Sequence, residues 1–133
     1  MIYSKTTRYT VQALVELAYT DSDEYQTIEK LSREVDVPGE FLAKIFQDLA
    51  KHGLLESRPG RGGGFRLSRA PGEIKLYEIV ELIEGPDPLS DCIFDGKVCH
   101  GDDPCPLHEQ WVPVRDELIN FLKGNTVADL AKQ

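Results

Sequence analysis

The sequence has little of what would place a protein in a membrane or in an oxidising compartment. None of its apolar runs approaches the roughly 18 residues needed to span a bilayer. No long apolar stretch follows the N-terminal residues 1–5, so a secretory signal is not expected. The expected location is therefore the cytoplasm, with no membrane partner. The three cysteines do not form a disulfide framework in that compartment, and their odd number and local clustering indicate metal or redox chemistry.

The residue patterns that enzymes use are also missing. The sequence shows no catalytic carboxylate pair and no nucleophile triad. The glycines of residues 60–64 are not followed by the Gly-Lys-Ser/Thr of a phosphate-binding loop. These absences argue against an enzyme with a small-molecule substrate. With 133 residues, 41% of them hydrophobic and 29% charged, the composition is that of an ordinary globular chain with one domain or one domain and a small appendage.

Positive charge is scarce overall, which would argue against a nucleic-acid partner if charge were spread evenly. The 15 Lys and Arg residues are outnumbered by 23 Asp and Glu residues, for a net charge of −8. Residues 1–69 contain ten residues of each sign, whereas residues 70–133 contain five basic and thirteen acidic residues. Residues 41–69 carry a net charge of +4. Because salt screens charges beyond roughly 8 Å, this basic stretch remains compatible with DNA; a solvated charged surface is the alternative.

Apolar spacing predicts three helices in the N-terminal half. A second, short helix is capped by Thr27, and a third is opened by Pro38 and ends at Gly53. The first helix is expected to bury a stripe at helical spacing, formed by Val11, Leu14, Val15 and Ala18. The third helix is expected to bury Phe41, Leu42, Ile45, Phe46 and Leu49.

The period then changes from helical to alternating. Leu55 and Ser57, and then Phe65 and Leu67, alternate on either side of the glycine-rich residues 59–64, which predicts two short strands joined by a hairpin tip. Each part alone could be a core helix or a surface hairpin. Their order favours a mainly α protein with a small β-hairpin wing, a winged helix-turn-helix over residues 1–70.

The third helix and the wing carry the candidate DNA-binding residues. The exposed face of the helix presents side chains that match base edges, followed by a lysine suited to phosphate. The wing presents arginines around a tip thin enough for a minor groove, and others at its base that suit phosphate. The predicted DNA-binding residues are Glu40, Ala43, Lys44, Gln47, Lys51, Arg58, Arg61 and Arg66, with Arg69 as a further phosphate contact.

Two further regions follow. Residues 71–106 are expected to hold a fourth helix, ended at Gly85-Pro86, and a loop that contains all three cysteines. Residues 107–133 are expected to form a long helix, which Pro113 should kink or displace, and a last short helix that Thr126 and Asp129 cap. The apolar residues of the long helix recur at heptad-like spacing, which predicts a dimerisation helix; packing onto its own winged helix is the alternative. These residues are Leu107, Trp111, Val114, Leu118, Phe121 and Leu122.

The most specific pattern is Cys92, Cys99, Cys105 and His108, separated by six, five and two residues. Thiolates are soft ligands that favour zinc or iron–sulfur clusters. A structural zinc site normally uses two closely spaced ligand pairs, and only Cys105 and His108 are so spaced. We therefore expect an iron–sulfur cluster whose cysteine ligands come from one long loop, most readily a two-iron (2Fe–2S) cluster. A four-iron (4Fe–4S) cluster and zinc are the alternatives.

Three segments together resemble the IscR/NsrR-type family of dimeric bacterial winged-helix regulators. They are residues 3–11, the wing residues 60–67 and the cysteine–histidine pattern, and the resemblance covers about residues 1–130. It implies that Cys92, Cys99, Cys105 and His108 ligate the cluster, as in the iron–sulfur-biogenesis branch. The nitric-oxide-sensing branch takes a carboxylate from the first helix, where this chain has Arg8.

The resemblance and the residue patterns together lead to one expected function. It is a homodimeric transcriptional regulator that binds a palindromic operator in double-stranded DNA and whose binding is modulated by an iron–sulfur cluster. Two alternatives stay open: a winged-helix regulator that responds through zinc or thiol oxidation, and an acidic winged-helix interaction module that does not bind DNA.

Overall fold

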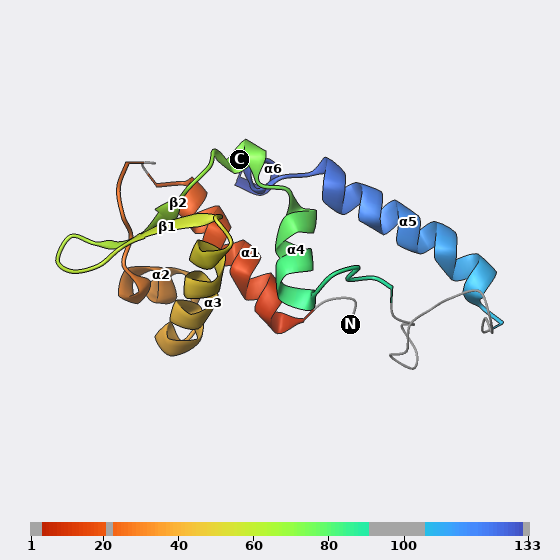
Figure 1. Cartoon of the computed structure of the whole chain (residues 1–133), viewed down its shortest axis with the longest axis horizontal. Helices are drawn as coiled ribbons and strands as arrows, with labels where there is room; N and C mark the ends of the chain where they lie inside the picture. Colours follow the sequence, from red (N-terminus) through yellow and green to blue (C-terminus); the bar gives the residue numbers. More distant parts are fainter. Residues whose placement is uncertain (1–3, 21–22, 91–105, 132–133) are drawn as a thin grey trace.

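The computed structural model describes residues 4–20, 23–90 and 106–131. Within them the protein is mainly helical, with one two-stranded antiparallel sheet (Figure 1). In chain order the elements are α1 (Lys5–Ala18), α2 (Ile28–Val35), α3 (Gly39–Lys51), β1 (Leu55–Arg58), β2 (Gly64–Leu67), the short 3₁₀ helix η1 (Pro71–Glu73), α4 (Leu76–Glu84), α5 (His108–Gly124) and α6 (Val127–Ala131). The predicted fold class, a mainly α chain with a hairpin wing, is confirmed.

Helix α1 lies at the centre of the arrangement. It packs against α2 and α3 on one side and against α4 and α6 on the other, while the hairpin and α5 project toward opposite ends of the molecule (Figure 1). The C-terminal end of α5 is tied back to the main body, because Leu76 N–H donates to Asn125 O (3.0 Å) and Val127 N–H donates to Ile74 O (2.9 Å). Among the described residues, no helix combines the length and apolarity needed to cross a bilayer.

The hydrophobic core joins residues from every long helix except the projecting part of α5. On α3, four of the five predicted core residues are buried: Leu42, Ile45, Phe46 and Leu49. The prediction that Phe41 is buried was wrong, since this side chain is 40% exposed and meets Tyr9 of α1 edge-on at 6.0 Å between ring centroids. The four buried residues already form a complete i, i+3, i+4, i+7 stripe, and Phe41 falls about 100° away from Leu42 on the helix.

The buried face of α1 is also rotated from the predicted one. Its buried residues are Thr7, Thr10, Ala13, Leu14 and Leu17, whereas Val11, Val15 and Ala18 are only half-buried. Two threonines can lie in the core because their hydroxyls are satisfied: Thr7 Oγ1 donates to Glu84 Oε1 (2.7 Å) and Thr10 Oγ1 donates to Thr6 O (2.7 Å).

Helix ends follow the local signals in the sequence. Thr27 caps α2 by accepting from Lys30 N–H (3.2 Å), and Gly53 follows α3 with a φ of 81°, the left-handed conformation that glycine adopts without strain. Asp129 accepts from Thr126 N–H (2.9 Å) at the start of α6. Helix α5 runs through Pro113, which has no backbone N–H to donate to the carbonyl group of Glu109. Glu109 is exposed, so water can satisfy this carbonyl group instead.

The carboxylate of Glu84 links the C-terminal end of α4 to the N-terminal end of α1 through hydrogen bonds. Glu84 Oε1 accepts from Ser4 N–H (2.7 Å) and from Thr7 Oγ1–H (2.7 Å). Burial raises the pKa of Glu84, but the hydrogen bonds from Ser4 and Thr7 outweigh it, so this pKa lies below its ordinary value of 4.5. The ionised carboxylate therefore stabilises the folded chain directly before residues 85–90, which lead toward the cysteines.

Glu84→Gln is expected to lower the free energy of unfolding at neutral pH by about 0.5–1 kcal/mol, a small effect because Glu84 as a residue is largely exposed to solvent. A carboxyl group whose pKa is lowered by folding stabilises above its unfolded pKa and stops doing so as the pH falls through its folded pKa. The difference between variant and parent, measured by urea unfolding, should therefore shrink below about pH 4.5. Glu81→Gln, one turn earlier on the exposed side, is the control; equal losses in both variants at every pH would contradict this prediction.

Candidate nucleic-acid interface

A groove of about 640 Å³ lies between α3 and the hairpin. One wall comes from α3 and the other from the two strands and their tip; the lining residues are Gln47, Ala50, Lys51, Ser57, Arg58, Pro59, Gly64 and Phe65. It thus brings together three of the predicted DNA-binding residues, Gln47, Lys51 and Arg58. Ser57 also lines this groove but was not among the predicted DNA contacts. Its position next to Arg58 in the sequence was a signal that could have indicated its hydroxyl as a further contact.

The outer face of α3 is available to a ligand over its whole length. Glu40, Lys44, Gln47 and Lys51 are exposed and Ala43 is half-buried. They lie opposite the buried stripe of the same helix, because the apolar residues that anchor α3 to the core leave the polar positions outside. Their predicted contacts with DNA bases and phosphates stay predictions.

The wing folds as a hairpin whose register pairs Ser57 with Phe65 and Arg58 with Gly64. The Phe65 ring packs on Phe46 of α3 at 5.3 Å between centroids, which fixes the core-facing side of the hairpin. Gly64 has a φ of 139°, and a Cβ there would collide with the carbonyl group of Gln26. Glycine therefore permits the close approach of the α1–α2 connection to the wing.

The arginines of the wing differ in what they bind. Arg66 donates to Glu56 Oε2 through Nε (2.8 Å) and to Asp23 O through Nη1 (3.2 Å), and the Glu56 hydrogen bond is the main cause that raises the pKa of Arg66. Arg58 and Arg61 are exposed and form no ion pair within the described residues. Two of the predicted wing contacts thus keep their full charge for an anionic partner, while Arg66 also holds the wing together.

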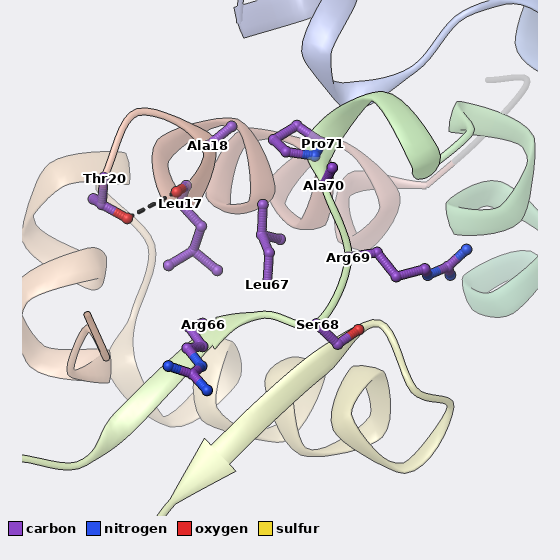
Figure 2. A pocket seen from close by; sticks show the side chains of 9 residues that line it. All are labelled: Leu17, Ala18, Thr20, Arg66, Leu67, Ser68, Arg69, Ala70 and Pro71. Atoms are coloured by element: carbon purple, nitrogen blue, oxygen red, sulfur yellow. Dashed lines mark hydrogen bonds between the residues drawn. The ribbon is translucent and has the colours of Figure 1, made fainter. Parts of the chain in front are cut away.

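A second pocket, of about 410 Å³, lies between the end of α1 and residues 66–71 (Figure 2). The side chains of Leu17 and Leu67 line it, whereas Arg66 and Arg69 point away from each other (Figure 2). Arg69 reaches α4, where its Nη2 pairs with Glu78 Oε2 at 2.8 Å. The lining residues include no set of acids, bases or nucleophiles that converge on one point, so this pocket is a gap in the packing and no candidate site. Arg69 joins the wing to α4.

The predicted metal ligands fall mostly outside the part that the structure describes. Cys92, Cys99 and Cys105 lie outside the described residues, and His108 is the first residue of α5, half-buried. Among residues 4–20, 23–90 and 106–131, no cluster of three or more His, Cys, Asp or Glu side chains could hold a metal ion. The ligand set therefore stays a prediction.

The apolar seam of α5 divides into two sides. Leu122 is buried and Leu118 packs against the core, whereas a second set is exposed to solvent. That set lies at intervals of seven residues and consists of Leu107 (45% exposed), Val114 (57%) and Phe121 (56%). One side of α5 therefore packs onto its own chain, as the alternative interpretation expected. The other side is exposed, and its role in dimerisation stays a prediction.

The exposed face of α3, the glycine-tipped wing and the basic groove between them define a winged-helix DNA-binding regulator of transcription. The chain matches the Rrf2 family model, described as "Iron-dependent Transcriptional regulator", over residues 3–133. It belongs to the Rrf2 family.

Known relatives agree with this assignment. The chain is 33% identical over 132 residues to a protein of Aquifex aeolicus (strain VF5) named for the HTH-type transcriptional regulators, covering 98% of this chain and 91% of the relative. It is 28% identical to the HTH-type transcriptional regulator IscR of Cronobacter sakazakii (strain ATCC BAA-894), covering 92% and 75% of the two chains. Among solved structures, CymR (YrzC), the global cysteine regulator of B. subtilis, superposes with a TM-score of 0.81 at 25% identity, covering 96% and 94%. The family resemblance predicted from the sequence is confirmed.

Proposed function

We propose that the protein is a homodimeric transcriptional regulator that reads a palindromic operator and whose DNA binding responds to an iron–sulfur cluster. The observation that carries the DNA-binding part is the groove between α3 and the wing, with Lys51 on one wall and Arg58 on the other. Two basic residues that line one groove suit the phosphate backbone, which positions a protein on DNA without reading sequence.

Sequence reading is assigned to the outer face of α3. A helix of this size fits the major groove, where Lys44 can donate to guanine and Gln47 can form two hydrogen bonds with adenine. Glu40 can accept from cytosine, and Arg61 at the wing tip can enter an adjacent minor groove. Because the chain carries a net charge of −8, long-range attraction contributes little, and specific contacts supply most of the affinity.

The proposed cluster is supported by the chemistry of the donor set. Three thiolates and one imidazole satisfy the coordination of a 2Fe–2S cluster, and an imidazole in place of a thiolate raises its reduction potential. Cys92, Cys99, Cys105 and His108 would hold it, and when bound it supplies a centre sensitive to iron supply and oxidation. His108 begins α5 beside Leu107, the first residue of the exposed stripe, so ligation at His108 would act directly on the proposed dimerisation helix.

The DNA-binding proposal is tested with a duplex selected from a random-sequence pool by the unsubstituted protein. Lys44→Ala and Arg61→Ala are each expected to weaken binding to the selected duplex by about 10-fold to 100-fold, as loss of a base contact does. Lys75→Ala, an exposed lysine at the start of α4 and outside the groove lining, is the matched control and should stay within about twofold. Failure to enrich any duplex would leave the interaction-module alternative, and equal losses in all three variants would indicate unspecific electrostatics.

A second candidate, regulation by thiol oxidation without a cluster, is favoured by one observation. The solved structure of CymR, named the global cysteine regulator of B. subtilis, has the same fold at 25% identity over 96% of this chain. The three cysteines would then respond through their own redox state, and the DNA-reading face would be unchanged.

A further inference from the structure

The side of the hairpin that faces away from the core carries an aromatic platform. Strand alternation places Glu56, Arg58 and Arg66 on this side, opposite Ser57 and Phe65, and the register sets Glu56 across from Arg66. The platform comes from another part of the chain, the connection between α1 and α2. The guanidinium carbon of Arg66 lies 4.5 Å from the centroid of the Tyr25 ring, and that of Arg58 lies 5.8 Å from it.

The Tyr25 ring is held in place from two directions. The next residue, Gln26, exchanges both backbone hydrogen bonds with Phe65 (2.8 Å each), so the α1–α2 connection adds a rung to the wing. Arg66 covers the ring and is itself fixed by the Glu56 carboxylate and the Asp23 carbonyl group. Tyr25 thus has a defined position relative to the strands.

Arg58 depends on this ring in a way that Arg66 does not. Arg66 has a carboxylate partner, which neutralises its charge, whereas Arg58 forms no ion pair within the described residues and lines the groove beside α3. A contact between a guanidinium group and an aromatic face restrains the side chain without cancelling its charge. An exposed arginine otherwise loses much rotamer freedom when it binds a phosphate.

We propose that Tyr25 is a positioning residue for DNA recognition: it restrains the charged Arg58 on the outer side of the wing for contact with the DNA backbone. The inference rests on the proposed function, because it concerns the same interface. Tyr25 itself does not touch DNA, and its contribution to affinity passes through Arg58.

The test compares the affinities of four variants for the selected duplex: Tyr25→Leu, Tyr25→Phe, Arg58→Ala and the double variant Tyr25→Leu/Arg58→Ala. Tyr25→Leu is expected to weaken binding by about threefold to tenfold, whereas Tyr25→Phe keeps the aromatic face and stays within about twofold of the parent. In the Arg58→Ala background, Tyr25→Leu should add less than about a twofold loss, because the residue through which it acts is gone. Urea unfolding of each variant checks the fold, and Tyr25→Gln repeats the test if the leucine variant does not fold.

The outcomes separate this inference from the proposal on which it rests. If Tyr25→Leu weakens binding equally with and without Arg58, the role of Tyr25 is merely structural and the inference is overturned. It is also overturned if a duplex is selected and Tyr25→Leu binds it as the parent does, in which case the DNA-binding function stands. If no duplex is selected, the DNA-binding function fails, and the inference fails with it.

Discussion

Cys105→Ser is expected to yield a colourless protein without bound iron or sulfide, whereas the parent, purified without oxygen, should be brown with about two irons and two sulfides per chain. A thiolate binds the iron of a cluster far better than a neutral hydroxyl does. Losing one of four ligands therefore removes the cluster rather than merely weakening it. The measurements are the visible absorption spectrum and chemical analysis for iron, sulfide and zinc.

Histidine variants identify the fourth ligand. The chain has three histidines, and the ring nitrogen Nδ1 of His52, directly after α3, already lies 2.9 Å from the carbonyl oxygen of Asp48. His108→Ala should destabilise the cluster, whereas His100→Ala, beside Cys99, and His52→Ala should leave the spectrum unchanged.

The same measurements separate the alternatives. A colourless parent with one zinc per chain and no sulfide would replace the cluster with a zinc site, since zinc thiolates do not absorb visible light. A colourless parent without any metal, whose DNA affinity changes when its thiols are oxidised and recovers on reduction, would favour the thiol-responsive candidate. Retention of iron and sulfide in Cys105→Ser would show that this cysteine is not a ligand.

Val114→Asp combined with Phe121→Asp is expected to convert the proposed dimer into a monomer. These side chains are 57% and 56% exposed in the single chain and lie on one stripe of α5, where apolar surface gains by pairing with a second copy. Two carboxylates per protomer at the centre of such an interface would be desolvated next to like charges, which costs several kcal/mol. The monomer can reach only one half-site, so affinity for a palindromic duplex should fall by about 100-fold or more.

Asn120→Asp is the matched control for the dimer. It adds a carboxylate to α5 at an exposed position next to Phe121 but off the stripe. Analytical ultracentrifugation should find the Asn120→Asp variant dimeric and the double variant monomeric at the same concentration. A monomeric parent, or equal dissociation of both variants, would contradict the role assigned to α5.

Local signals were enough to predict the α-helices and the hairpin, although not the short 3₁₀ helix η1 (Pro71–Glu73). The caps at Thr27 and Thr126 and the stop at Gly53 each involve residues a few positions apart, and hydrogen bonds at that range form in the same way whatever surrounds them. The alternation of Leu55, Ser57, Phe65 and Leu67 predicted the hairpin for the same reason. The uneven distribution of charge between residues 1–69 and 70–133 was equally visible, as was the family resemblance.

Packing between elements could not be predicted in the same way. Periodicity predicts which side of a helix is apolar, but not how many neighbours that helix meets. Helix α1 meets neighbours on two sides, so its buried face includes Thr7 and Thr10, whose hydroxyls needed partners, and Val11 and Val15 were left half-buried. Phe41 shows the converse, an apolar residue left at the edge of a core that four other residues of α3 already fill.

Tertiary contacts also give different environments to residues that look alike in the sequence. Arg58 and Arg66 look alike in the sequence, yet Glu56 neutralises only Arg66, because strand register places those two residues opposite each other. The seam of α5 reads as one stripe, yet Leu122 is buried within the protomer while Phe121 is 56% exposed. The composition therefore determined which chemistry this protein carries, and the three-dimensional packing determined which of its side chains remain available, because availability depends on distances between residues far apart in the chain.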